Sequence, residues 1–222
     1  RQMCIRDSRQ LSSIEMKYNN ICALVLPNGI DMAISFLALA NYVTVSPLNP
    51  NYTMDEFLFF LKDLDCEFIV TDNNASNALV EAAKQLEIKL FRIDNVTQKN
   101  ELLIKFLPLS SICSVNENKG DDICLILHTS GTTSRPKQVQ LSCTNIISSA
   151  FNISSVLKLE QSDKGFNIMP LFHIHGLIAS LLSSIITGAS LVCTNGFNAL
   201  TFYGNIKNFK PTWITAVPTM YQ

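Results

Sequence analysis

Residues 127–137 read LHTSGTTSRPK, and this stretch decides how the rest of the chain is interpreted. It follows an apolar segment at 123–128 that is predicted to be a strand, and it ends in Lys137. Hydroxyls and exposed backbone N–H groups suit phosphate oxygens, glycine permits close backbone approach, and lysine supplies a compact positive charge. The hydroxyl residues and the glycine are Thr129, Ser130, Gly131, Thr132, Thr133 and Ser134. The stretch is therefore predicted to bind phosphate, although an ordinary polar loop has the same composition.

Two common nucleotide-binding motifs do not account for this loop. A P-loop has its second glycine five residues after the first, directly followed by lysine and then by serine or threonine. Here Pro136 stands in place of that glycine, and Gln138 follows Lys137. The dinucleotide fingerprint G-x-G-x-x-G is also absent, because no two glycines of the chain stand two residues apart. Any phosphate site here must have another design.

Segments of strand and helix character alternate on both sides of the loop. Before it, strands are predicted at 21–26, 43–45, 67–71 and 88–93, separated by helices at 30–42 and 74–86 and by a helix that Thr53 caps. After it come a polar connection, helices at 142–157, 174–187 and 200–209, and strands at 166–169, 190–193 and 212–215. Such alternation implies βαβ units. We expect an α/β fold with mostly parallel sheets and flanking helices.

The polar segment at 95–120 is the clearest candidate for a linker, especially at 116–120. It divides the chain into expected subdomains at about 9–115 and 120–222. Residues 1–8 fit neither and are interpreted as a non-native or unmatched start. Because the chain stops just after Pro218 opens another predicted helix, we expect a truncated protein.

Charge and cysteine content exclude several classes of protein. The 222 residues include 17 Lys and Arg and 18 Asp and Glu, a formal net charge of −1, which argues against nucleic acid as the main partner. The seven cysteines form no CxxC pair, so neither a zinc site nor a disulfide framework is indicated, and a reducing compartment is expected.

Residues 165–206 contain no charged side chain, although 16% of the chain is charged. A membrane span needs about 20 consecutive apolar residues. Pro170, Gly176 and Gly188 interrupt this stretch, so we expect strands and a helix buried between packed layers instead of a span.

Two motifs resemble those of the adenylate-forming family, which comprises acyl-CoA synthetases, luciferases and peptide-synthetase adenylation domains. Residues 129–138, TSGTTSRPKQ, match eight of ten positions of the family loop [ST]-[ST]-G-[ST]-[ST]-G-x-P-K-G. Residues 170–176, PLFHIHG, resemble its motif P-x-[FY]-H-x-x-G. Ser134 and Gln138 depart from the loop pattern. Ser-Arg-Pro-Lys at 134–137 is similar to the branch of oxalate–CoA ligases and peroxisomal CoA synthetase-like proteins.

This resemblance covers about residues 9–222 and implies part of the large N-terminal domain of an adenylate-forming enzyme. It implies that ATP activates a carboxylic acid as an acyl-adenylate and that coenzyme A then takes the acyl group, with Mg²⁺ neutralising the phosphates. The residues expected to bind the phosphates are Thr129, Ser130, Gly131, Thr132, Thr133 and Lys137. Phe172 and His173 are expected in the acyl and nucleotide pocket, and Lys137 and His173 in catalysis. No residue of this chain is expected to bind a metal.

Several alternatives stay open at this point. The leading substrate is a small carboxylic acid, with oxalate first. One alternative is a non-catalytic truncated remnant with at most weak nucleotide binding, and another is a fatty-acyl or luciferase-like adenylating enzyme. The chain by itself is expected to be inactive. Arg135 is equally compatible with a phosphate contact and with an exposed charge, whereas His128 and His175 are expected to serve the structure. The expected compartment is cytoplasmic or peroxisomal.

Overall fold

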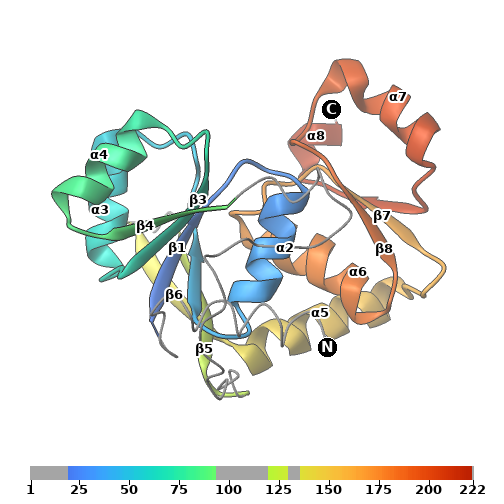
Figure 1. Cartoon of the computed structure of the whole chain (residues 1–222). Coiled ribbons are helices and arrows are strands. Elements are labelled where there is room, and N and C mark those ends of the chain that lie inside the picture. The colour runs from blue at the N-terminus through green and yellow to red at the C-terminus, as the bar shows by residue number, and fades with distance from the viewer. Residues whose placement is uncertain (1–19, 94–119, 130–135, 222) are drawn as a thin grey trace, which may run out of the picture. The chain divides into compact units, whose positions relative to one another are not determined.

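The computed structural model describes residues 20–93, 120–129 and 136–221 (Figure 1). The chain divides into two compact units, one formed by residues 1–27 and 34–143 and the other by residues 28–33 and 144–222. One boundary falls inside helix α2 (Ile30–Leu39), and the last falls at the start of helix α5 (Cys143–Leu157). The expected bounds of 9–115 and 120–222 therefore differ from these units.

A six-stranded sheet of order β4-β3-β1-β2-β5-β6 forms the centre of the first unit. Its strands are β1 (Ile21–Val25), β2 (Thr44–Pro47), β3 (Phe68–Asp72), β4 (Lys89–Ile93), β5 (Ile123–Thr129) and β6 (Lys137–Ser142). The first five pair in parallel, and β6 alone runs antiparallel to its neighbour β5. The predicted α/β fold with a mostly parallel sheet is confirmed.

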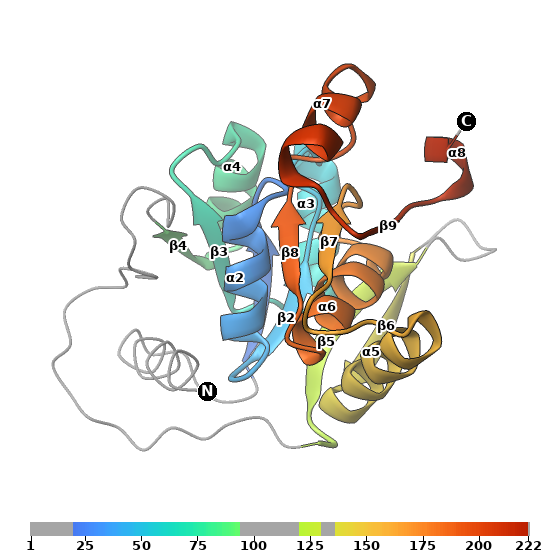
Figure 2. The same ribbon diagram turned by 90° about the vertical axis from the view of Figure 1, so that its right-hand side faces the viewer.

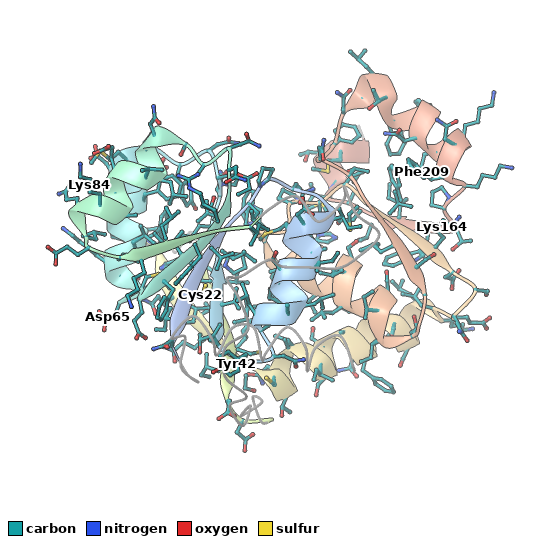
Figure 3. All side chains as sticks on the ribbon, in the orientation of Figure 1. Cys22, Tyr42, Asp65, Lys84, Lys164 and Phe209 are labelled. Atoms are coloured by element: carbon teal, nitrogen blue, oxygen red, sulfur yellow. The ribbon has the colours of Figure 1, made fainter. Side chains whose placement is uncertain are left out.

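Helices α3 (Met54–Asp63) and α4 (Asn77–Gln85) lie side by side against one face of this sheet (Figure 1). Their buried side chains pack on Ala23, Ile69 and Ile126 of the strands. Strands covered on both faces consist of apolar residues almost throughout, as β1 does. Cys22 of β1 is fully buried inside the unit (Figure 3), and burial raises the pKa of its thiol well above the ordinary value.

The capping box predicted for α3 is present. The Thr53 hydroxyl accepts a hydrogen bond from the Glu56 backbone N–H at 3.3 Å, and Glu56 Oε2 accepts one from the Thr53 N–H at 2.8 Å. These bonds satisfy N–H groups that the first turn of a helix leaves without partners. The helix thereby begins at a fixed residue and buries Phe57, Phe60 and Leu61.

Strand β6 was not predicted, because the sequence analysis placed a polar connection between residues 128 and 142. The strand pairs along β5 from Thr129↔Lys137 to Ile123↔Ser142. Its sequence KQVQLS has only two large apolar residues, and most of its side chains are exposed or half-buried. Such a segment has little apolar alternation to reveal it, and its backbone pairing with β5 places β6 in the first unit.

The second unit is built on a three-stranded parallel sheet of order β8-β7-β9. Its strands are β7 (Lys164–Asn167), β8 (Ser190–Cys193) and β9 (Trp213–Thr215), and its other helices are α6 (Ser183–Ile186), α7 (Ala199–Phe209) and α8 (Pro218–Tyr221). Figure 2 shows β7 and β8 side by side, with α6 next to them. The uncharged stretch supplies buried residues such as Phe166, Leu171 and Leu177. No helix within the described ranges is both long and apolar enough to cross a membrane.

The helix predicted at 174–187 consists of two parts. A π-helix, η2 (His175–Leu182), precedes α6. Two serine hydroxyls near the junction donate to backbone carbonyls of η2, Ser183 Oγ to Ile178 O and Ser184 Oγ to Ser180 O, both at 2.8 Å. Periodicity alone cannot separate the two helix types over so few residues, and π-helical turns are frequent at functional sites.

Candidate nucleotide and acyl site

The residues predicted to bind phosphate are the last residue of β5, the first residue of β6 and residues between these strands in the sequence. Thr129 is the last residue of β5 and Lys137 the first of β6, and the two are register partners. The Thr129 hydroxyl donates to the Lys137 carbonyl at 3.5 Å. Both side chains are exposed, so the Lys137 ammonium group is available to an anion at this end of the strand pair, and the Thr129 hydroxyl could donate to one after releasing the Lys137 carbonyl. Ser130, Gly131, Thr132 and Thr133, with Ser134 and Arg135, lie outside the described residues.

Thr129 and Lys137 flank the loop, and we call the strand ends that carry them its two stems. A set of polar contacts lies directly beside these stems. The Gln138 carboxamide donates to Asp63 Oδ2 at 2.8 Å and also to the Asp63 backbone carbonyl. His128 Nε2 lies 3.0 Å from the same Asp63 oxygen. The hydrogen bonds from Gln138 and then from His128 hold the pKa of the Asp63 carboxyl below its ordinary value. The three residues are joined across 65 and 75 positions of sequence, so no local pattern could have predicted this set.

The second motif forms the turn that leads from β7 into η2. His173 N–H donates to Pro170 O at 3.2 Å, and Leu177 N–H donates to His173 O at 3.1 Å. The rings of Phe172 and His173 lie next to each other, with centroids 4.5 Å apart. Desolvation lowers the pKa of the His173 imidazole below its ordinary value, which favours the neutral ring. It can therefore donate or accept a hydrogen bond there without carrying charge.

Asn28 fixes this turn from outside the motif. Its Oδ1 accepts a hydrogen bond from the Leu171 backbone N–H at 2.8 Å, and its Nδ2 donates to Thr194 O at 2.9 Å. Thr194 Oγ1 donates in turn to Asn167 O at 2.8 Å. Gly176 is required on steric grounds, because a Cβ atom there would lie 2.3 Å from the Pro170 carbonyl oxygen. The sequence analysis assigned no role to Asn28, which stands in a Pro-Asn-Gly turn after an apolar strand.

The other two histidines also have partners. His128 contacts Asp63 as described above, and His175 Nε2 lies 2.7 Å from Thr215 Oγ1. Within the described ranges, no three side chains of the His, Cys, Asp and Glu types gather closely enough to hold a metal ion.

The described site residues are distributed over both units. Thr129 and Lys137 belong to the first unit, and Phe172 and His173 belong to the second. Each pair is adjacent within its own unit. The first pair has donor chemistry that fits phosphate, and the second has an aromatic wall beside a neutral imidazole.

Comparison with known proteins identifies the class to which this α/β chain and its two motifs belong. The sequence model of AMP-binding enzymes matches residues 2–222, so the chain belongs to the AMP-binding enzyme family. It is 40% identical over 221 residues to oxalate–CoA ligase of Arabidopsis thaliana, covering 97% of this chain and 43% of that protein. It is 33% identical over 223 residues to oxalate–CoA ligase of Saccharomyces cerevisiae, covering 89% of this chain and 41% of that one.

A solved structure extends the comparison to the fold. The chain superposes on o-succinylbenzoate coenzyme A synthetase from Bacillus subtilis, in complex with ATP and magnesium, with a TM-score of 0.78 and 26% identity. The match covers 98% of this chain and 56% of that one. The predicted membership of the adenylate-forming family is confirmed. The chain spans about two fifths of the length of the oxalate–CoA ligases that it matches.

Proposed function

We propose that this chain is the phosphate-binding part of an acid–CoA ligase. Such an enzyme joins a carboxylate oxygen to the α-phosphorus of ATP and releases pyrophosphate. The sulfur of coenzyme A then bonds to the acyl carbon, and AMP leaves. The observation that carries the proposal is the similarity to two oxalate–CoA ligases along nearly the whole chain.

The proposed roles follow from the chemistry of the side chains. Lys137 and the Thr129 hydroxyl bind the β- and γ-phosphates together with Ser130, Gly131, Thr132 and Thr133. Negative charge on the phosphate oxygens is then offset by a fixed ammonium group and by hydrogen-bond donors. Bound Mg²⁺ would add further positive charge at the phosphates. His173 donates a hydrogen bond to the acid or the adenylate, and Phe172 forms a wall of the same pocket.

The proposed substrate is a small carboxylic acid, with oxalate first. The support is that two relatives, 40% and 33% identical to this chain, are named for this acid. The rival, a fatty-acyl or luciferase-like enzyme, shares the family and both motifs. The chain by itself is proposed to bind nucleotide weakly and to complete no catalytic cycle, since it spans only part of its relatives. The proposed compartment remains cytoplasmic or peroxisomal.

Pyrophosphate release tests this function. The longest product that the gene encodes is incubated with ATP, Mg²⁺ and one acid at a time, from oxalate and succinate to octanoate. We expect release to depend on the acid and to be fastest with oxalate, and added coenzyme A to yield the matching thioester. Fastest release with octanoate would favour the fatty-acyl rival, and no release with any acid would refute the ligase function.

A further inference from the structure

Gln138 occupies the loop position at which the family pattern has glycine, and its carboxamide is bound to Asp63. We infer that Gln138 is a positioning residue for Lys137, acting through a clamp formed by Asp63, His128 and Gln138. The clamp ties both stems of the loop to the last residue of α3. This inference rests on the proposed function, because it assigns Gln138 a role only if Lys137 binds phosphate.

The side chains of the neighbouring residues 137 and 138 point to opposite faces of strand β6. Side chains alternate between the faces of a strand, so Gln138 points toward α3 while Lys137 points away from it. The observed exposure agrees, since Gln138 is half-buried and Lys137 is exposed. A side chain at 138 can therefore be anchored without obstructing the ammonium group at 137.

The position of β6 in the sheet explains why an anchor matters. Within the described residues, β6 is the last strand of the order and pairs only with β5. The start of such a strand is held by few backbone hydrogen bonds, and glycine there would add backbone freedom. Gln138 supplies two side-chain contacts instead, one to a carboxylate and one to the carbonyl of the same residue. Hydrogen bonds to an ionised group are stronger than neutral ones.

His128 completes the clamp from the neighbouring strand. It is the register partner of Gln138, and its imidazole also contacts Asp63 Oδ2. The His128 side chain is only 6% exposed, and its ring packs edge-on against Phe60 of α3 with centroids 4.7 Å apart. The Asp63 Oδ2 atom thus receives one contact from each stem of the loop. The arrangement restrains Thr129 and Lys137 relative to each other at the two ends of the loop.

The test compares two glutamines of the same strand. Gln140 lies on the same face of β6 two residues further along and is exposed, so Gln140→Ala is the matched control for Gln138→Ala. MgATP affinity is measured by calorimetry, and hydrogen exchange of the β6 amides is measured without nucleotide. We expect Gln138→Ala to weaken MgATP binding about fivefold, the size of a lost charge-assisted contact that acts indirectly. We also expect faster exchange at the start of β6, with neither change in Gln140→Ala.

A double variant shows whether Gln138 acts through Lys137. In the Lys137→Ala background, Gln138→Ala should change MgATP affinity less than twofold, because the group that it positions is gone. A full fivefold loss in that background would overturn the inference, as would unchanged amide exchange in Gln138→Ala. A third outcome is faster amide exchange in Gln138→Ala together with wild-type MgATP affinity in Lys137→Ala. The clamp would then be a structural contact only, and Lys137 would have no role in binding phosphate. A wild-type chain that binds no MgATP overturns both.

Discussion

Lys137 is the residue on which the proposed phosphate site depends most directly. Replacing it with alanine removes an exposed ammonium group beside Thr129. We expect MgATP affinity to fall about tenfold, the size of one charge-assisted contact. Calorimetry with the chain measures this, and Lys84→Ala is the control because Lys84 is exposed on α4 of the same unit and extends away from the ribbon (Figure 3). Equal affinities in all three proteins would remove the role of Lys137.

Asp63 gives the clamp a dependence on pH. The pKa of its carboxyl is lowered in the folded state by the hydrogen bonds from Gln138 and His128. Its stabilising contribution is therefore fully present above the unfolded-state pKa, near 4, and is lost as the pH falls through the folded-state value. Asp63→Asn should show a shallower loss of unfolding free energy between about pH 5 and pH 2 than wild type. Urea unfolding measures this, and Asp65→Asn, at an exposed neighbour, should retain the wild-type slope.

Asn28 should stabilise the turn that carries His173. Asn28→Ala removes two hydrogen bonds to backbone groups that are partly buried. We expect the free energy of unfolding to fall by about 1–3 kcal/mol, because the Leu171 N–H and the Thr194 carbonyl lose their partner. Asn152→Ala, at an exposed position of α5 in the same unit, should change it by less than about 0.5 kcal/mol. Similar values for the two variants would contradict the role of Asn28.

At the scale of the element, the start of η2 depends on a glycine. A Cβ atom at 176 would meet the Pro170 carbonyl at 2.3 Å, whereas one at Gly204 in α7 would meet nothing within 4 Å. Gly176→Ala should therefore cost about 1–3 kcal/mol through forced backbone movement. Gly204→Ala should stabilise the chain by about 0.5–1 kcal/mol, because alanine favours the helix. Thermal unfolding of both variants checks the pair, and a harmless Gly176→Ala would show that the turn can relax.

Elements with strong local patterns were predictable from the sequence, and others were not. The capping box, the buried strand β1 and the strand β8 at 190–193 lie where hydrophobic runs and turn residues indicated them. Strand β6 was missed because it is held by backbone pairing with β5. The helix at 174–187 was predicted, but eight residues are too few to separate the period of the π-helix η2 from that of an α-helix. In the site, motif matching named Lys137 and His173. It could not find Asp63 or Asn28, whose partners lie 75 and 143 positions away.

At the scale of the whole molecule, large apolar side chains remain exposed on the second unit. No residue of α7 is buried, and Leu200 and Tyr203 on this helix are 96% and 80% exposed. Surface of this kind favours association. We expect the isolated chain to self-associate at micromolar concentration, and Leu200→Ser combined with Tyr203→Ser to reduce this. Light scattering measures the change, and Thr201→Ser on the same helix is the control. An unchanged scattering signal in the double variant would exclude α7 as the cause.

The hydrogen bonds of Asn28 also have a consequence for synthesis of the chain. Asn28 leaves the ribosome 143 residues before Leu171 and 166 residues before Thr194. At a translation rate of about 5–20 residues per second, the interval before Leu171 appears is roughly 7–30 s. During that time β1 can already pair with its neighbours while the turn that follows it lacks both partners. The hydrogen bonds of Asn28 are therefore among the contacts of the second unit that form late in synthesis.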